Sequence, residues 1–391
     1  MSSPIIRAAA ALGALTLSAV ALTACTPSTA APVATGASEG LTIGAVDLSA
    51  ACPETVVIQT DWNPQSEQGG LFNLLGTDAT IDAGAKRVSG PLYSQGEWTG
   101  VNVEIRAGGP AIGFTGVPAQ MYTDPEILLG WVNTDEAIAN SADRPTTAVL
   151  ATFEKAPWII MWDPETYPEA DAIEDLSETD ATVRYFDGTT YMDYLVGSGQ
   201  LRADQVDGSY DGSPSNFLAA GGKDAQQGFA TVEPWVYENA IDGWMKPVGY
   251  QLVADTGYPI YAVSLAVRSE DVKQQSGCLA ALVPVIQQAT VDFFAEPDAA
   301  NELIVAAVDA YDNGWVYPQG EADNSATQQR ELGLAANAVD GTFGAFDAER
   351  IADVLSIVTP IMDSKGVPIA EGLTAADLAT NEFLDPAISL P

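Results

Sequence analysis

The chain has 391 residues, of which 47% are hydrophobic; it has 53 Asp and Glu against 15 Lys and Arg, no His, and a formal net charge of -38 at pH 7. The length exceeds what one hydrophobic core usually serves and predicts two lobes or domains, while the acidic excess argues against nucleic acid as a partner, because such a surface repels phosphate. Without histidine, Ser-His-Asp and Cys-His catalysis and imidazole-built metal sites are excluded. Mechanisms that use only carboxylates remain open.

The first segment, residues 1–24, has the pattern of a bacterial lipoprotein signal peptide. One charge, at Arg7, precedes an apolar run that is too short to span a bilayer, for which ~20 residues are needed. The run ends in LTAC at residues 22–25, which resembles a lipobox and predicts a lipid on Cys25. Residues 25–52 then resemble a flexible tether. A plain secretory signal with a chance cysteine is the alternative.

Two further cysteines, Cys52 and Cys278, make an even pair in a chain that is expected to face an oxidising compartment. We predict that they form a disulfide. Two separate buried thiols are the alternative.

The segment after the tether alternates between strand and helix patterns. Short β-branched or alternating runs predict strands, and capping residues before apolar runs predict helices. Strands are expected at residues 55–60, 101–107, 126–133 and 146–153, helices at 67–76 and 134–141, and a long irregular surface loop at 77–100.

The alternation then repeats and gives way to helices. Strands are expected at residues 158–162, 181–186, 228–232, 248–253 and 259–268, helices at 189–196 and 215–220, and a mostly helical portion from residue 271 onward. Strands that alternate with helices predict an α/β fold, in which ligands bind beyond the carboxyl ends of the strands.

Four segments in this order resemble a known family: TDWNPQSEQGGLF (60–72), VNTDEAIANS (132–141), ATFEKAPWIIMW (151–162) and GGKDAQQGFATVEPWVYENA (221–240). They are similar to the substrate-binding proteins of ABC importers, and more narrowly to the type II periplasmic binding proteins for alkanesulfonates, nitrate or the pyrimidine precursors of thiamine. The resemblance implies an α/β fold of two doubly wound lobes, joined by a hinge, with a ligand cleft between them.

The same resemblance implies the organisation and the setting of the chain. Lobe 1 would comprise residues 53–153 and 259–391, and lobe 2 residues 154–258, with crossings near Phe153 and Pro259. The protein would be a monomer, and the predicted lipid on Cys25 would anchor it at the extracytoplasmic face of the membrane. Its partners would be a small ligand and an ABC permease, and it would need no cofactor or metal.

Candidate ligand contacts in lobe 1 follow strand ends. Asp61, Trp62 and Asn63 come directly after the first strand, where an indole can stack on a flat ligand and the polar groups can hydrogen-bond its edge. Gly109 follows another strand and offers backbone amides, and Asp135 opens a helix. Helix capping, a tight turn and core packing would explain the same residues without a ligand.

In lobe 2 the candidates are Thr189 and Tyr191 at a helix start, Trp158 on a strand, and the segment FATVEPWVY with Glu233 and Trp235. A buried carboxylate needs a donor, which an amino-substituted ring would supply, and Trp235 would stack on that ring. The alternative is that Glu233 pairs with a basic side chain and Trp235 packs in the core.

These acids and indoles predict a flat heterocycle, such as a thiamine-precursor pyrimidine, as the ligand. A sulfonate or nitrate ligand is the alternative if Arg106 and Lys155 point into the cleft. A cell-wall hydrolase with a carboxylate pair and a surface scaffold are the remaining classes. No segment proposes bond-breaking chemistry, so no catalytic residue is predicted.

Overall fold

The computed structural model describes residues 40–391. The predicted signal peptide at 1–24, the lipid site at Cys25 and residues 25–39 of the tether lie outside the described residues.

The first sheet has seven strands in the order β2-β3-β4-β1-β5-β12-β6. Its centre is β1, which pairs in parallel with β4 and with β5, while β12 runs antiparallel between β5 and β6. We call the body around this sheet lobe 1. The strands are β1 (Thr55–Gln59), β2 (Thr80–Asp82), β3 (Arg87–Ser94), β4 (Glu97–Arg106), β5 (Ile127–Val132), β6 (Thr146–Leu150) and β12 (Ser264–Arg268).

The expectation of an irregular loop at residues 77–100 was wrong. This segment forms β2, β3 and the start of β4, paired as an antiparallel meander. The hairpin between β3 and β4 turns at Gln95 and Gly96, whose φ angles are 49° and 80°. Two positive φ values are what a tight two-residue hairpin needs. The many Gly and Asp residues therefore marked turns between strands rather than one long loop.

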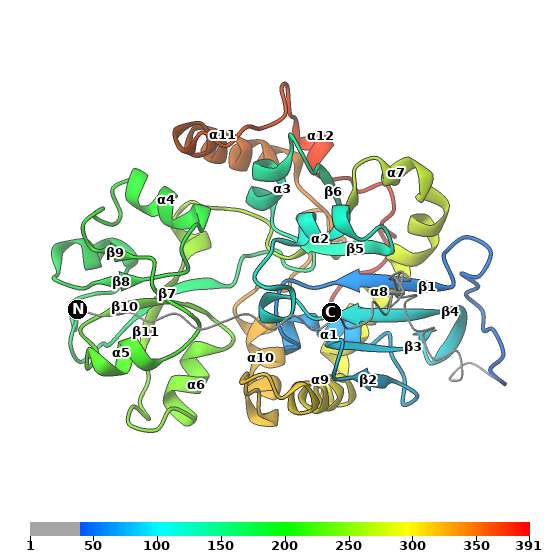
Figure 1. Cartoon of the computed structure of the whole chain (residues 1–391), viewed down its shortest axis with the longest axis horizontal. Helices are drawn as coiled ribbons and strands as arrows, with labels where there is room; N and C mark the ends of the chain where they lie inside the picture. The colour runs from blue at the N-terminus through cyan, green and yellow to red at the C-terminus, as the bar shows by residue number, and fades with distance from the viewer. Residues whose placement is uncertain (1–39) are drawn as a thin grey trace, which may run out of the picture. The chain divides into compact units, whose positions relative to one another are not determined.

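The second sheet has five strands in the order β11-β7-β10-β8-β9, and we call the body around it lobe 2. Strand β10 pairs antiparallel with β7 and parallel with β8. This sheet lies to the left of the first one in Figure 1. The strands are β7 (Trp158–Trp162), β8 (Val183–Arg184), β9 (Val206–Asp207), β10 (Ala225–Phe229) and β11 (Gly249–Leu252).

Helices pack around both sheets. Those of residues 40–263 are α1 (Gly69–Phe72), α2 (Val117–Thr123), α3 (Thr134–Asn140), α4 (Thr190–Gly197), α5 (Ser215–Ala219) and α6 (Glu233–Asn239), with 3-10 turns η1 (Ser66–Gln68), η2 (Gly109–Ile112), η3 (Ile173–Glu178) and η4 (Val253–Thr256). The C-terminal portion adds α7 (Asp271–Gln274), α8 (Ser276–Ala295), α9 (Asp298–Tyr311), α10 (Gln319–Glu331), α11 (Ala348–Lys365) and α12 (Ala375–Leu378). By length and composition α8 could cross a membrane, but it lies largely buried, as the core helix of a folded domain does.

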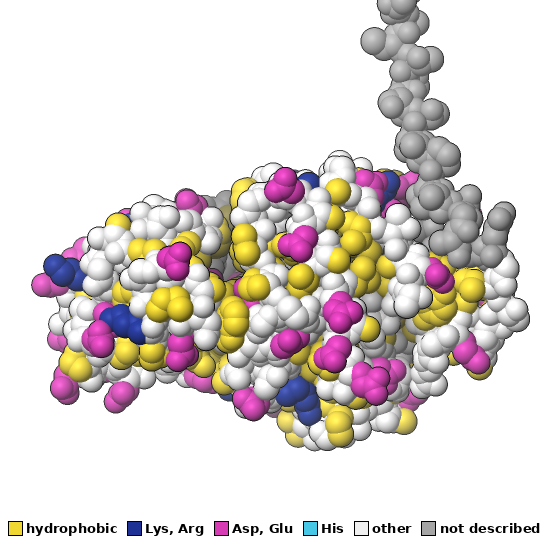
Figure 2. Space-filling view, turned by 90° about the horizontal axis from the view of Figure 1, so that it is seen from below, with side chains coloured by type: hydrophobic (Ala, Val, Ile, Leu, Met, Phe, Trp, Pro, Cys, Tyr) yellow, Lys and Arg dark blue, Asp and Glu magenta, His cyan; other side chains and the backbone are white. Residues whose placement is uncertain are grey.

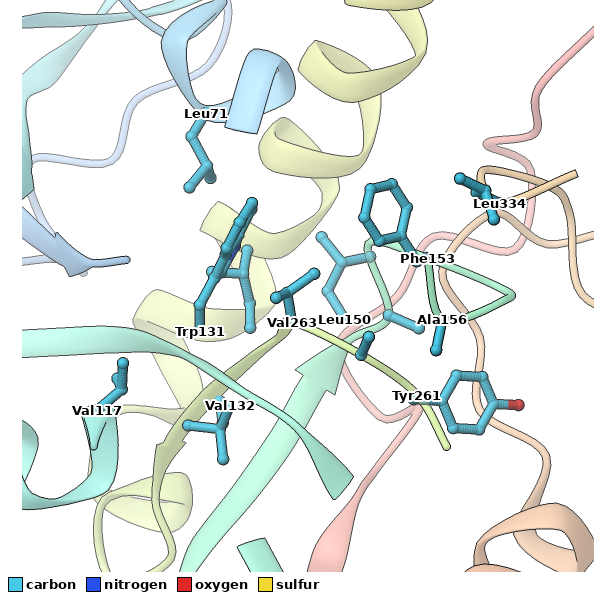
Figure 3. Close-up of a cluster of buried hydrophobic side chains, with 14 of the residues drawn as sticks. Leu71, Val117, Trp131, Val132, Leu150, Phe153, Ala156, Tyr261, Val263 and Leu334 are labelled. Carbon is cyan, nitrogen blue, oxygen red and sulfur yellow. The ribbon is translucent and has the colours of Figure 1, made fainter. Parts of the chain in front are cut away.

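Two segments, residues 151–157 and 257–263, connect the sheets, and both are anchored by buried side chains (Figure 3). Phe153 and Tyr261 are each 1% exposed. From α11, Arg350 binds both segments: its guanidinium pairs with Glu154 at 2.9 Å and donates to the carbonyl of Ile260 at 2.8 Å. Arg350 therefore ties both connections to α11.

The predicted disulfide is confirmed. Cys52 and Cys278 are bonded, with their Cα atoms 4.6 Å apart. The bond links the segment before β1 to the first turn of α8, across 226 positions of sequence.

The surface carries the acidic excess of the composition. On the face in Figure 2, Asp and Glu side chains are scattered over both lobes and Lys and Arg side chains are few.

Candidate functional site

A cavity of about 170 Å³ lies between the two lobes. Lobe 1 supplies the loop after β1 and the loop after α9, and lobe 2 supplies the ends of its strands and the start of α6. The lining residues are Asp61, Trp62, Gln65 and Trp315 from lobe 1, and Trp158, Phe186, Tyr210, Gly212, Gln227, Gly228, Phe229, Val232 and Glu233 from lobe 2.

On the lobe 1 side, the backbone of Asp61 and Trp62 is held by a glycine loop. The amide of Gly108 donates to the carbonyl of Trp62 and that of Gly109 to the carbonyl of Asp61, both at 2.8 Å. At Gly109, where φ is +53°, a Cβ would lie 2.6 Å from the indole of Trp62. Gly109 therefore supports Trp62 from behind and does not line the cavity.

On the lobe 2 side, Glu233 is the first residue of α6 and its carboxylate is fixed at both oxygens. The amide of Phe229 donates to Oε2 at 2.6 Å, and the phenol of Tyr210 donates to Oε1 at 3.2 Å. A Cβ on Gly228 would lie 2.9 Å from Cδ of Glu233. The missing side chain at Gly228 therefore makes room for the carboxylate over the end of β10.

Burial controls the ionisation of both carboxyls. It raises the pKa of Asp61 to about 7, with a smaller contribution from the charge of Glu67. It likewise raises the pKa of Glu233 to about 7, against the lowering effect of the Phe229 amide. Oδ1 of Asp61 is buried without a hydrogen-bond partner among residues 40–391. The cavity thus holds two acids that exchange protons near neutral pH.

Trp235, which we expect to line the cleft beside Glu233, is not among the residues that line this cavity. Both residues belong to α6, and successive helical residues turn by about 100°, so positions i and i+2 face nearly opposite directions. The indole of Trp235 packs against Gly320 of α10, where a Cβ would lie 3.0 Å from it. Trp235 therefore lies where the lobes meet, outside the cavity.

Three of the other predicted residues are absent from the cavity lining. Asn63 is 1% exposed and accepts a hydrogen bond from the amide of Asn313 at 2.8 Å. Asp135 accepts one from the phenol of Tyr258 at 2.8 Å. Thr189 precedes α4 as its N-cap residue. These residues do not line the cavity.

Tyr191 is also buried behind the wall, where it supports two residues that do line the cavity. Its phenol donates to the side-chain carbonyl of Gln227, and its ring lies 5.3 Å from the ring of Trp158. Of the predicted contacts, Asp61, Trp62, Trp158 and Glu233 lie in the cavity wall.

The two basic side chains that would favour an anion are engaged elsewhere. Arg106 pairs with Glu104 and with Asp124, each at 2.6 Å. Lys155 pairs with Asp255 at 2.9 Å. No Lys or Arg is among the described residues that line the cavity.

Sequence reasoning missed most of the aromatic wall. Phe186 and Tyr210 follow short strands of lobe 2, and Trp315 follows α9 in lobe 1. The ring of Trp62 lies 6.0 Å from that of Phe186 and 5.9 Å from that of Trp315. Aromatic residues in Gly- and Asn-rich loops, as in NGWVYP at residues 313–318, were the available signal.

Comparisons with known proteins agree on the fold. No family model matches the chain, and no curated protein sequence does. The structure resembles the periplasmic aliphatic sulphonate binding protein SsuA from Escherichia coli, with 12% identity and a TM-score of 0.51 over 87% of this chain and 94% of that one. It also resembles a periplasmic sulfonate-binding protein SsuA from Methylobacillus flagellatus KT, with 14% identity and a TM-score of 0.51 over 84% and 92%. The chain therefore has the two-lobe α/β fold of the type II periplasmic binding proteins.

Proposed function

We propose that the protein is a solute-binding component of an ABC importer that captures a small molecule between its lobes. The observation that carries the proposal is the cavity of about 170 Å³, lined by both lobes and by aromatic rings with two carboxylates. Its volume is close to the ~150 Å³ of a cavity that holds one benzene ring. Binding there would stabilise the conformation in which the lobes contact each other.

The lining supports a ligand that is not an anion. Sulfonate and nitrate favour positive surroundings, whereas this wall combines the carboxyls of Asp61 and Glu233 with the amides of Gln65 and Gln227. An amino-substituted heterocycle, such as a thiamine-precursor pyrimidine, would offer donors to these carboxylates and a face to the rings. The fold is shared with sulfonate-binding proteins, but fold alone does not determine the ligand.

A lipid anchor at Cys25 would hold the protein at the membrane surface, where it could deliver its ligand to a permease. The test is to replace Cys25 with Ser and follow the protein by detergent-phase partitioning. We expect the variant to move to the aqueous phase or to fail to mature. Unchanged partitioning would contradict the lipid anchor and would leave the proposal of ligand binding unaffected.

Ligand capture is tested by a thermal-shift screen of the purified full-length chain with pyrimidines, vitamins, amines, amino acids and sulfonates. A compound that binds only the folded state raises the melting temperature. We expect a stabilising compound that is recovered unchanged, with the shift lost in Trp62→Ala. Chemical conversion of the bound compound would instead support a hydrolase, and no stabilisation by any class would overturn the proposal.

A further inference from the structure

Neighbouring aromatic rings in the cavity wall meet at steep angles. The planes of Trp62 and Trp315 meet at 88°, and those of Trp62 and Phe186 at 66°. Phe186 then meets Tyr210 at 60° with ring centroids 4.9 Å apart. Rings that meet at steep angles can contact a bound group on several sides. We call Trp62, Trp158, Phe186, Tyr210 and Trp315 the aromatic box.

The ionisable groups that line the cavity beside the aromatic box are two carboxyls, one from each lobe. Asp61 contributes an oxygen without a partner, and Glu233 contributes a carboxylate that accepts only neutral donors. A buried carboxylate without a cation is costly, because neutral hydrogen bonds replace only part of its hydration. The basic groups considered above pair with other acids. The site therefore holds two carboxyls whose ionised forms a cationic ligand would stabilise.

We propose that the aromatic box binds an organic cation, either an alkylated ammonium or a protonated heterocycle, with its positive charge between Asp61 and Glu233. The proposal rests on the proposed function, since it names the ligand class of the same cavity. Ring faces attract cations through their quadrupoles, and the attraction is strongest for indole and for desolvated sites. A neutral isostere would fill the same space and leave both carboxylates unpaired. The acidic surface would also raise the local concentration of cations.

Binding of a cation would be coupled to the release of protons from Asp61 and Glu233. The groups around Glu233 are Tyr191, Tyr210, Tyr237, Glu67 and Glu321, all acids or phenols that do not supply positive charge.

Around Asp61 the charged neighbours are Glu67 and Glu136. Because burial places the pKa of Asp61 and of Glu233 at about 7, a fixed cation would displace protons from them at pH 6. Affinity for such a cation should then rise from pH 6 to pH 8.

The test is calorimetric titration of the full-length chain with matched probe pairs. Choline is compared with neutral 3,3-dimethylbutan-1-ol, and N-methylpyridinium with neutral toluene. We expect each cation to bind at least ~tenfold more tightly than its isostere, which is the scale of a desolvated cation–π contact. The choline pair reports an alkylated ammonium and the pyridinium pair a flat cation, so the stronger pair identifies the source.

Variants give a second readout. Asp61→Asn and Glu233→Gln should each reduce the preference for the cation and flatten its pH dependence. Glu238→Gln is the matched control, because Glu238 is exposed on the same helix as Glu233 and its substitution removes a carboxylate outside the cavity. This control should change neither the preference for the cation nor the pH dependence of binding.

The outcomes separate this inference from the proposed function. Equal affinity for a cation and its isostere, or tight binding of a sulfonate, would overturn the cation inference and leave solute binding intact. Binding of no small molecule by the unmodified chain would overturn both.

Discussion

The hydroxyl of Thr231 in lobe 2 donates a hydrogen bond to Oε1 of Glu67 in lobe 1. Thr231 is 0% and Glu67 5% exposed, so the bond crosses between the lobes in a buried position. The hydroxyl of Ser325 in α10 donates to the same oxygen at 2.9 Å. One carboxylate therefore receives one donor from each lobe.

Replacing Thr231 with Val should favour separation of the lobes in the ligand-free chain. The variant keeps the shape of the side chain but removes the donor, and an under-satisfied buried acceptor costs ~1–3 kcal/mol. We expect a larger radius of gyration in small-angle scattering.

Ser325→Ala is the matched control, because it removes a donor to the same oxygen from within lobe 1. It should lower the free energy of unfolding and leave the radius of gyration unchanged. Equal expansion of both variants would show that the bond between the lobes does not hold them together.

Replacing Gly228 with Ala should weaken ligand binding. The new Cβ would lie within 3.0 Å of Cβ, Cγ and Cδ of Glu233, so the carboxylate must move from its place in the cavity. Displacement of a charge-assisted contact predicts a loss of about tenfold in affinity for choline, measured by calorimetry.

Gly197→Ala in α4 is the control for this substitution, because a Cβ there meets nothing within 4 Å. It should keep the affinity of the parent and gain slightly in helix stability. If Gly228→Ala binds choline as well as Gly197→Ala does, Glu233 does not hold the ligand.

Replacing both Cys52 and Cys278 with Ala should lower the melting temperature without changing ligand affinity. The bond closes a loop across 226 positions, and chain entropy gives such a closure up to ~5 kcal/mol. Both residues lie in lobe 1, away from the cavity. Thiol labelling of the unmodified, unreduced chain should find neither residue, and labelling of either would contradict a stable bond.

The sequence predicted the alternation of elements well, because buried parallel strands such as β1 and β5 are continuous apolar runs. It also placed Asp61, Trp62 and Glu233 near one site, since strand ends of an α/β sheet gather ligands. The sequence pattern did not predict in which direction each side chain points. The pairing of Glu233 with Trp235 ignored the helical turn between them, although Pro234 already marked a helix start.

The remaining parts of the site came from loops whose position depends on tertiary packing. Trp315 follows α9, about 250 positions after Trp62, yet the two rings lie 5.9 Å apart. No local period relates such residues, because each loop is placed by a different element. The meander at β2 and β3 was missed for another reason: its glycines and aspartates fit turns and loops equally well.

The stability of the folded chain should depend on pH through its buried carboxyls. Burial raises the pKa of Glu136 to about 8 and that of Glu321 to about 9, with the charges of Glu233 and Glu67 adding to the latter. A carboxyl whose pKa is higher in the folded state binds protons more tightly there than in the unfolded chain. Its contribution is therefore greatest at low pH and is lost as pH rises from its unfolded pKa to its folded pKa.

We expect the ligand-free chain to melt at a higher temperature near pH 5 than at pH 8. Each such group changes the free energy of unfolding by up to ~1.4 kcal/mol per pH unit between its two pKa values. Glu321→Gln removes one titrating group, since Glu321 is 2% exposed and an amide fills the same space. Its melting temperature should depend less on pH than that of the parent, whereas Glu331→Gln at the exposed end of α10 should follow the parent. A melting temperature that rises from pH 5 to pH 8 would show that these carboxyls are already ionised in the folded protein, and hence that the lobes hold them in a more polar setting than their burial implies.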